Sequence, residues 1–232
     1  MRLTKAQRTM LLLGLVPLLA LLVAGVGVTV GMIRGRLGYN SASEFAAPAQ
    51  GVRIASDVPT EVLASVDGKV HVTVSGSYAA AKPDIRISPM AGALTIGARC
   101  PDVHCNVDLT VEVPAETAVE AKVEQVSLDV AGVASPLTLD ATGGSVNLAR
   151  VRSPDVSVNV RGGSITLFFD NPPNRVRATA SDGSITVQVP RTVSYGINAV
   201  AAQGSTDLSV PNDQSATHQL YLRTRYGSIT VQ

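Results

Sequence analysis

Histidines, cysteines and acidic residues are the side chains of this sequence that could bind a metal ion or transfer a proton. Cys100 and Cys105 enclose Asp102 and His104, so four possible metal ligands lie within one short segment. Their spacing matches neither a Cys-x-x-Cys nor a His-x-x-x-His pattern. Two cysteines so close together in a polar segment are instead typical of a local disulfide in an oxidising compartment. We therefore expect a Cys100–Cys105 disulfide and no metal site.

The acidic residues do not form a recognisable catalytic pair. Glycoside hydrolysis needs two carboxyl groups that face each other across the scissile bond. In the repeat described below the aspartates fall at different positions. Asp129 and Asp207 share one position, but several repeats separate them. The sequence also has no Gly-x-Ser-x-Gly or Ser-x-x-Lys motif and no phosphate-binding loop. We expect neither catalytic residues nor a cofactor.

Serine recurs in one repeated context. The six copies are Val126-Ser127-Leu128, Gly144-Ser145-Val146, Gly163-Ser164-Ile165, Gly183-Ser184-Ile185, Gly204-Ser205-Thr206 and Gly227-Ser228-Ile229. A unit that returns about every 20 residues is the signature of a repeat architecture. A row of hydroxyl groups could bind a glycan. Stacked hydroxyls that bond one another or the backbone explain the row without a ligand, and we favour that structural interpretation.

Alternating apolar and polar residues around each motif predict strands. Mostly apolar residues stand seven, five and three positions before the motif's first residue, and two and four positions after it. This period-two pattern is typical of strands with one buried face. We predict an all-β fold, a β-solenoid with about 20 residues per coil, in which Gly-Ser forms the corner between two strands. A β-sandwich of short hairpins is the alternative. The solenoid is favoured because the inward positions keep their phase across the copies.

Residues 51–99 alternate out of phase with the later repeat. We predict that they form an N-terminal β cap, which would protect the end of the solenoid from edge pairing. Asp67-Gly68 lies between two apolar runs and predicts a hairpin turn. Residues 100–232 then form the solenoid. Val107 takes the corner position of its first coil, one repeat before Val126.

The N-terminal segment predicts a membrane anchor. Residues 1–9 are polar and basic, and residues 10–33 carry no charge and would span about 36 Å as a helix. A cleaved signal peptide is the alternative, with a weak cleavage site at Leu22-Val23-Ala24. An uncleaved signal anchor is favoured because the apolar run continues well past that site. Residues 34–50 read as a juxtamembrane linker.

Charge and composition limit the location and the partners. Arg2, Lys5 and Arg8 precede the span, whereas Arg34 and Arg36 follow it. The positive-inside rule therefore places the N-terminus in the cytoplasm and residues 34–232 outside it, in a single-pass protein of a bacterial cell membrane. The net charge is +1 and 3% of the residues are aromatic, so we expect no nucleic-acid partner.

The last repeat ends directly at Gln232. If this coil closes the stack, its open edge could accept a strand from a partner or from a second copy of the chain. Arg223, Arg225 and Tyr226 would lie on that edge. Alternatively, residues 51–99 or the segment 211–219 cover this end.

The repeated Gly-Ser-Ile/Val-Thr/Asn-Val/Leu units behind one apolar segment resemble the bacterial DUF4097 family, also described as an auto-transporter adhesin-like β-strand-repeat family. The resemblance covers roughly residues 51–232. It implies a membrane-anchored, β-solenoid-like envelope domain, and some relatives are associated with envelope-stress systems. The family contributes no site residues.

Two functions follow from these expectations. The favoured one is a non-enzymatic envelope protein whose solenoid is an adhesin-like binding or scaffolding module, with a cell-wall glycan as one candidate ligand. The alternative is an accessory or sensor subunit of a membrane transport or envelope-stress signalling complex. A glycan-processing enzyme is a third class, which the missing acidic pair disfavours.

Overall fold

The computed structural model describes residues 35–232, of which residues 39–232 form one compact unit. The regular elements of this part of the chain are all strands. They are β1 (Leu37–Ala46), β2 (Val52–Ser56), β3 (Thr60–Ser65), β4 (Lys69–Tyr78), β5 (Asp84–Met90), β6 (Ala93–Arg99), β7 (Asn106–Pro114), β8 (Val119–Glu124), β9 (Leu128–Ala131), β10 (Leu137–Thr142), β11 (Val146–Val151), β12 (Asp155–Arg161), β13 (Ile165–Phe169), β14 (Arg175–Asp182), β15 (Ile185–Gln188), β16 (Tyr195–Gln203), β17 (Thr206–Leu208), β18 (His218–Tyr226) and β19 (Ile229–Val231).

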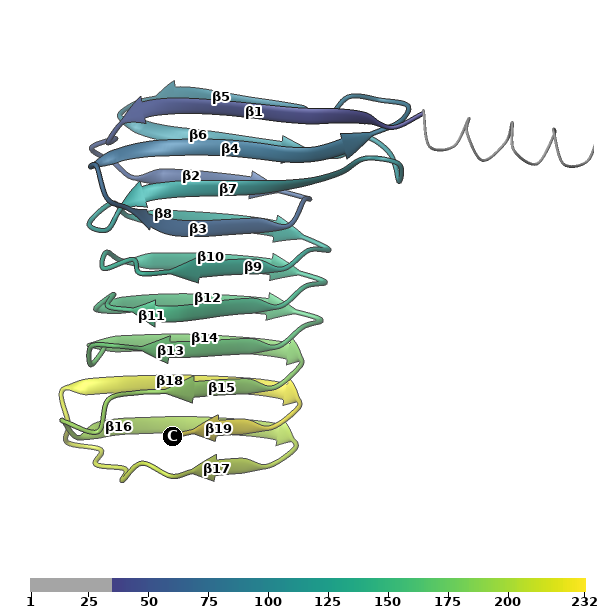
Figure 1. The fold of residues 1–232 in the computed structure, drawn as a ribbon. Coiled ribbons are helices and arrows are strands. Elements are labelled where there is room, and N and C mark those ends of the chain that lie inside the picture. The colour runs from purple at the N-terminus through teal and green to yellow at the C-terminus, as the bar shows by residue number, and fades with distance from the viewer. Residues whose placement is uncertain (1–34) are drawn as a thin grey trace, which may run out of the picture. The chain divides into compact units, whose positions relative to one another are not determined.

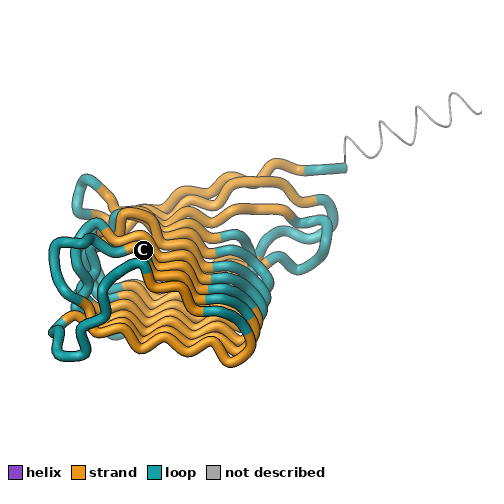
Figure 2. The backbone as a smooth tube through the Cα atoms, turned by 90° about the horizontal axis from the view of Figure 1, so that it is seen from below, coloured by secondary structure: helices purple, strands orange, loops and turns teal. Residues whose placement is uncertain are grey.

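The strands form two facing sheets. One has the order β1-β4-β7-β3-β9-β11-β13-β15-β19-β17, and the other has the order β16-β18-β14-β12-β10-β8-β2-β6-β5. Seen along the stack, the strands superpose in two layers joined by corners (Figure 2). The all-β, solenoid-like fold predicted from the repeat is therefore confirmed.

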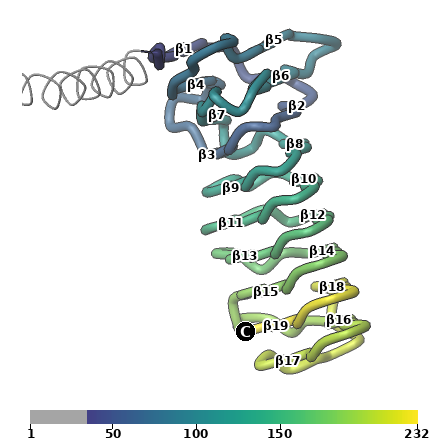
Figure 3. The backbone as a smooth tube through the Cα atoms, turned by 90° about the vertical axis from the view of Figure 1, so that its right-hand side faces the viewer, coloured from purple at the N-terminus to yellow at the C-terminus, as the bar shows by residue number. Residues whose placement is uncertain are grey.

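Each coil places one strand in each sheet. From one end of the stack to the other, the coils are β6–β7, β2–β3, β8–β9, β10–β11, β12–β13, β14–β15, β18–β19 and β16–β17 (Figures 1 and 3). Neighbouring coils pair in parallel throughout. At ~4.8 Å between strands, these coils extend for about 34 Å.

The predicted phase of the repeat is confirmed by the register. In one sheet Leu137 pairs with Val119 on one side and with Val156 on the other. In the other sheet Val146 pairs in the same way with Leu128 and Ile165. These side chains are buried, and the inward residues of the coils, apart from those of the exposed strand β17, join in one continuous apolar core. The β-branched residues stack well on such pleated faces.

Two coils stand out of chain order, and here the sequence prediction was wrong. The coil β2–β3 lies between β6–β7 and β8–β9, so the coil at Val107 keeps the predicted phase but is not the neighbour of the coil at Val126. Likewise, β18–β19 lies between β14–β15 and β16–β17. Residues 220–232 therefore do not close the stack.

The predicted N-terminal cap is smaller than residues 51–99. Val52 pairs with Val119 and Thr60 with Leu128, so β2–β3 is a coil in phase with the others. The strands that cap this end within the described residues are β1, β4 and β5, and β4 and β5 run antiparallel to β7 and β6. Because β7 lies between β3 and β4, Asp67-Gly68 does not form the predicted hairpin.

Part of the predicted linker 34–50 is also a strand. In β1 the half-buried positions alternate with exposed ones, and Tyr39 and Phe45 pack against the core. The ring of Tyr39 meets that of Tyr78 edge-on, with 6.3 Å between centroids. Small and polar residues hid the alternation, because an edge strand that buries little needs few apolar side chains.

The predicted membrane anchor, residues 10–33, lies outside the described residues. Across residues 35–232, no helix has the length and apolar character needed to span a bilayer.

Candidate functional site

The glycines of the Gly-Ser corners are required by the close stacking of the coils. A Cβ on Gly163 would lie 2.0 Å from the carbonyl oxygen of Gly144, and one on Gly183 would lie 2.0 Å from that of Gly163. The same close approach brings Gly227 against the carbonyl oxygen of Gly183 and Gly204 against that of Gly227, following the order of the coils in the stack. No side chain fits at such distances, so these positions need glycine for close backbone approach.

The corner serines form a ladder beside the glycines. The N–H of Ser164 donates to Oγ of Ser145 at 3.3 Å, and the N–H of Ser184 donates to Oγ of Ser164 at 3.4 Å. Ser228 continues the ladder on Ser184, and Ser205 completes it with a hydroxyl–hydroxyl contact of 3.0 Å to Ser228. Each serine satisfies a corner group of its neighbour, which supports the structural interpretation of the row.

Cys100 and Cys105 are joined by a disulfide that fixes the loop between β6 and β7. The carboxylate of Asp102 accepts hydrogen bonds from the backbone N–H groups of His104, at 2.7 Å, and of Ala81, at 3.1 Å. The backbone N–H of Cys100 donates to Asp57 at 2.8 Å. These groups are engaged in holding the loop. Within residues 35–232 no group of three or more histidine, cysteine, aspartate or glutamate side chains could hold a metal ion.

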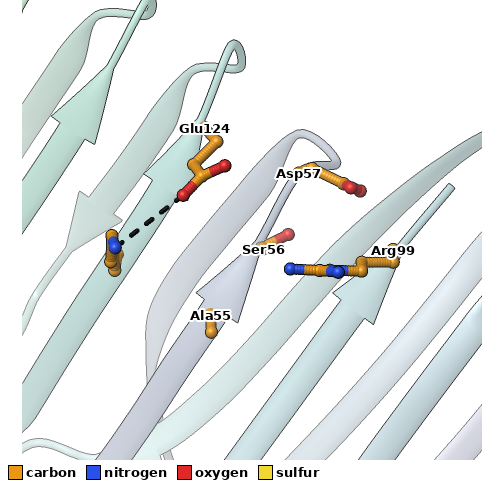
Figure 4. A pocket seen from close by; sticks show the side chains of 6 residues that line it. Ala55, Ser56, Asp57, Arg99 and Glu124 are labelled. Carbon is orange, nitrogen blue, oxygen red and sulfur yellow. Dashed lines mark ion pairs between the residues drawn. The ribbon is translucent and has the colours of Figure 1, made fainter.

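The outer face of the sheet that contains β2, β6 and β8 carries a shallow pocket (Figure 4). Ala55, Asp57, Arg99, Lys122 and Glu124 contribute to its lining, and Arg99 extends from β6 toward β2. Lys122 lies 3.8 Å from the carboxylate of Glu124. Cations and carboxylates alternate here, so the pocket has no net preference for an anion.

The same alternation extends over the outer face of β2, β5 and β8. Arg53 pairs with Glu120 at 3.2 Å, and Arg86 pairs with Asp84 at 2.7 Å. These pairs are exposed and contribute little to stability, but they neutralise the basic side chains of this part of the face.

The C-terminal part of this face differs, because its arginines are not neutralised. β14 carries Arg175 and Arg177, and β18 carries Arg223 and Arg225, all exposed and outward-facing. None forms an ion pair with a carboxylate of residues 35–232, although Asp155 is the register partner of Arg175. We call these four residues the arginine stripe.

The register places the stripe in a line along the strand direction. Arg177 is aligned with Tyr221, two residues before Arg223, so each outward row across β14 and β18 contains one arginine of the stripe. Aromatic rings contact two of the guanidinium groups. Arg177 lies 5.7 Å from the ring centroid of Tyr221, and Arg225 lies 5.1 Å from that of Tyr226.

The stripe was not predicted from the sequence. It depends on β18 lying beside β14, which the order of the repeats conceals. In chain order β16 would be that neighbour, and its outward residues Asn198 and Val200 are uncharged. The available signal was arginine at two outward positions in each of two repeats, 175/177 and 223/225.

The open edge expected at Arg223, Arg225 and Tyr226 is elsewhere, since β18 pairs with β14 and β16, and β19 with β15 and β17. At this end of the stack the terminal strands of the two sheets are β16 and β17. The side chain of Asn212 covers part of the edge of β16. Its amide oxygen accepts a hydrogen bond from the N–H of Ile197 at 2.8 Å, and its amide nitrogen donates one to the C=O of Ile197 at 3.0 Å.

Together these features define a two-sheet parallel β-solenoid, capped by antiparallel strands at one end and carrying charged side chains in fixed rows outside. A family model described as Toastrack DUF4097 matches residues 108–232, which is more than half of the chain, and the protein belongs to that family. No curated protein matches the sequence.

Several solved structures are similar to this chain, all at low sequence identity. A proposed adhesin from Bacteroides fragilis is 16% identical with a TM-score of 0.52, and the match covers 84% of this chain and 97% of that one. A proposed cell adhesion protein from Clostridium sporogenes is 13% identical with a TM-score of 0.47, covering 84% and 99%. A proposed adhesin from Parabacteroides merdae is 11% identical with a TM-score of 0.42, covering 83% and 96%.

Proposed function

We propose that this protein is a non-enzymatic binding module of a bacterial envelope, anchored by residues 10–33 with its N-terminus in the cytoplasm. The observation that carries the proposal is the placement of β1 and β17 at opposite edges of the ten-stranded sheet. An anchor that precedes β1 would hold the capped end and leave the outer faces of the coils free for a ligand.

Two further observations support this function. The Cys100–Cys105 disulfide suits an oxidising compartment outside the cytoplasm. The Bacteroides fragilis structure, which shares the fold, is described as a proposed adhesin. Family membership and the description of this neighbour together favour a binding role over an enzymatic one.

The anchor and its orientation can be tested on the full-length protein in its native membrane. We expect the protein to stay in the membrane pellet after alkaline carbonate extraction. A C-terminal epitope tag should be digested by protease added outside cells whose membrane is sealed. Release by carbonate, or protection of the tag in sealed cells together with digestion after lysis, would contradict the proposal.

A second candidate function is that of an accessory or sensor subunit in a membrane complex. It is favoured by Gly27 and Gly31, which have the small-xxx-small spacing at which transmembrane helices pack closely. Replacing residues 10–33 with an unrelated anchor separates the two functions. Loss of a stoichiometric membrane partner on gentle purification would favour the subunit, whereas retained cell-surface ligand binding would favour the adhesin-like module.

A further inference from the structure

The arginine stripe concentrates positive charge that the net charge of +1 conceals. Elsewhere on the same face Arg53, Arg86 and Lys122 each have a carboxylate partner. The stripe has no such partner among residues 35–232, and a row of unpaired guanidinium groups raises the local concentration of anions. Unlike lysine, arginine binds a carboxylate or a phosphate through two parallel hydrogen bonds.

The spacing of the stripe matches a linear ligand. Outward residues two apart on a strand are separated by about 6.6 Å, and adjacent strands by ~4.8 Å. Four successive rows therefore give a line of arginines about 20 Å long, from Arg175 on β14 to Arg225 on β18. A polymer with anionic groups about 7 to 8 Å apart would meet one arginine per row.

The surroundings of the stripe suit a sugar polymer. The outward residues beside the middle rows of the stripe are neutral hydrogen-bonding side chains, such as Ser157 on β12 and Thr179 on β14, whereas the charged Asp155 and Arg161 of β12 lie beside its two ends. A shallow depression of about 420 Å³ adjoins it and is lined in part by Thr138, Asp155, Ser157, Arg175 and Arg177. Hydroxyl groups of a sugar find partners here, whereas a lipid surface would also need apolar side chains to insert.

A nucleic acid fits this surface less well. Non-specific binding of single strands relies on aromatic rings on which bases stack. The rings of Tyr221 and Tyr226 instead support Arg177 and Arg225. Their contacts hold the guanidinium groups in place, which lowers the entropic cost of binding an anion.

We propose that the outer face of β14 and β18 binds an anionic polysaccharide, whose carboxylate or phosphate groups pair with Arg175, Arg177, Arg223 and Arg225. The insertion of β18 between β14 and β16 creates the site, because it brings the two arginine pairs together. This inference rests on the proposed function in that it names the ligand class for the same outward-facing module.

The test uses the full-length protein in phosphatidylcholine nanodiscs. Polygalacturonate supplies carboxylates, phosphomannan supplies phosphates, and dextran is the neutral control. We expect binding to at least one of the anionic polymers and none to dextran. Affinity should fall as the salt concentration rises. The polymer that binds more tightly identifies the anionic group.

The variant Arg177→Gln/Arg223→Gln removes the centre of the stripe. Losing two charge-assisted contacts should weaken polymer binding by about tenfold or more. The matched control Arg53→Gln/Arg86→Gln removes two paired arginines from the same face and should change affinity by less than about twofold. All four side chains are exposed, so both variants should keep the wild-type circular dichroism spectrum.

Three results would overturn the proposal. They are no binding of either anionic polymer at low salt, equal losses in the two double variants, or tighter binding to phosphatidylglycerol vesicles or to oligo(dT) than to the polymers. None of these results bears on carbonate extraction or tag accessibility, so failure of the ligand assignment is distinguishable from failure of the proposed function.

Discussion

The backbone N–H of Ser228 donates a hydrogen bond of 3.2 Å to Oγ of Ser184, although the two residues are 44 positions apart in the chain. This contact links the coil β18–β19 to the coil β14–β15. The coil β16–β17 comes between these two coils in the chain but lies on the far side of β18–β19 in the stack. In chain order, the terminal coil β16–β17 thus comes before β18–β19, the coil that separates it from β14–β15.

Deleting residues 218–232 tests this order of coils. The deletion removes β18–β19, whose strands pair with β14 and β15 on one side and with β16 and β17 on the other. We expect β16–β17 to lose its support and become sensitive to protease, with cleavage within residues 190–217. If the coils were stacked in chain order, residues 195–208 would stay protected, and that result would contradict the structure.

Gly163→Ala should be strongly destabilising. Gly163 does not have a positive φ, so the substitution tests close approach to the carbonyl oxygen of Gly144 and not backbone strain. Forcing a methyl group into this contact should cost about 3 kcal/mol and lower the Tm by about 6 to 12 °C. In the control Gly38→Ala, no atom lies within 4 Å of the added Cβ, and the Tm should change by less than about 2 °C. Equal effects would refute the stacking explanation.

Ser164→Ala, at the adjacent position, should have a small effect. Oγ of Ser164 accepts one long hydrogen bond from the N–H of Ser184 at an exposed corner. Water can replace that acceptor, so the cost in unfolding free energy should stay below about 1 kcal/mol. Urea denaturation of wild type and variant measures the difference. A loss as large as that of Gly163→Ala would mean that the ladder, and not the glycine contact, holds the corners.

The sequence predicted the phase of the repeat well but not the order of the coils. The phase of the repeat depends on which residues face inward, and the alternation of apolar and polar residues predicts this directly. The order of the coils in the stack cannot be predicted in this way, because all coils present nearly the same apolar pattern to their neighbours. Skipping one level lengthens a connection by only about 4.8 Å, which two residues can span. The links from β7 to β8 and from β15 to β16 are short loops of ordinary length.

The strand β1 and the arginine stripe escaped prediction for related reasons. Edge strands bury little, so the alternation of Tyr39 and Phe45 with small residues resembled a linker. The stripe depends on a contact between β14 and β18 that no local pattern records. The disulfide pair and the glycine corners could be predicted because their determinants lie within a few residues of each other.

Tyr195 provides a test of the packing within the terminal coil β16–β17. Its side chain is fully buried, and its hydroxyl donates a hydrogen bond of 2.8 Å to the C=O of Pro190. Burial raises the pKa of Tyr195 to about 12. In the unfolded chain the phenol ionises near pH 10. Above that pH the unfolded state therefore binds fewer protons than the folded state, and stability falls as the pH rises.

Tyr195→Phe should be less stable than wild type near pH 8 by about 1 kcal/mol, because the hydrogen bond to Pro190 is lost. Between pH 10 and about pH 12, the wild type also loses the contribution of the buried phenol, which the variant lacks. The gap between their unfolding free energies should therefore narrow across this window. Urea denaturation at pH 8, 10 and 11.5 measures the gap, and a constant difference would show that the Tyr195 hydroxyl ionises as readily in the folded protein as in the unfolded chain.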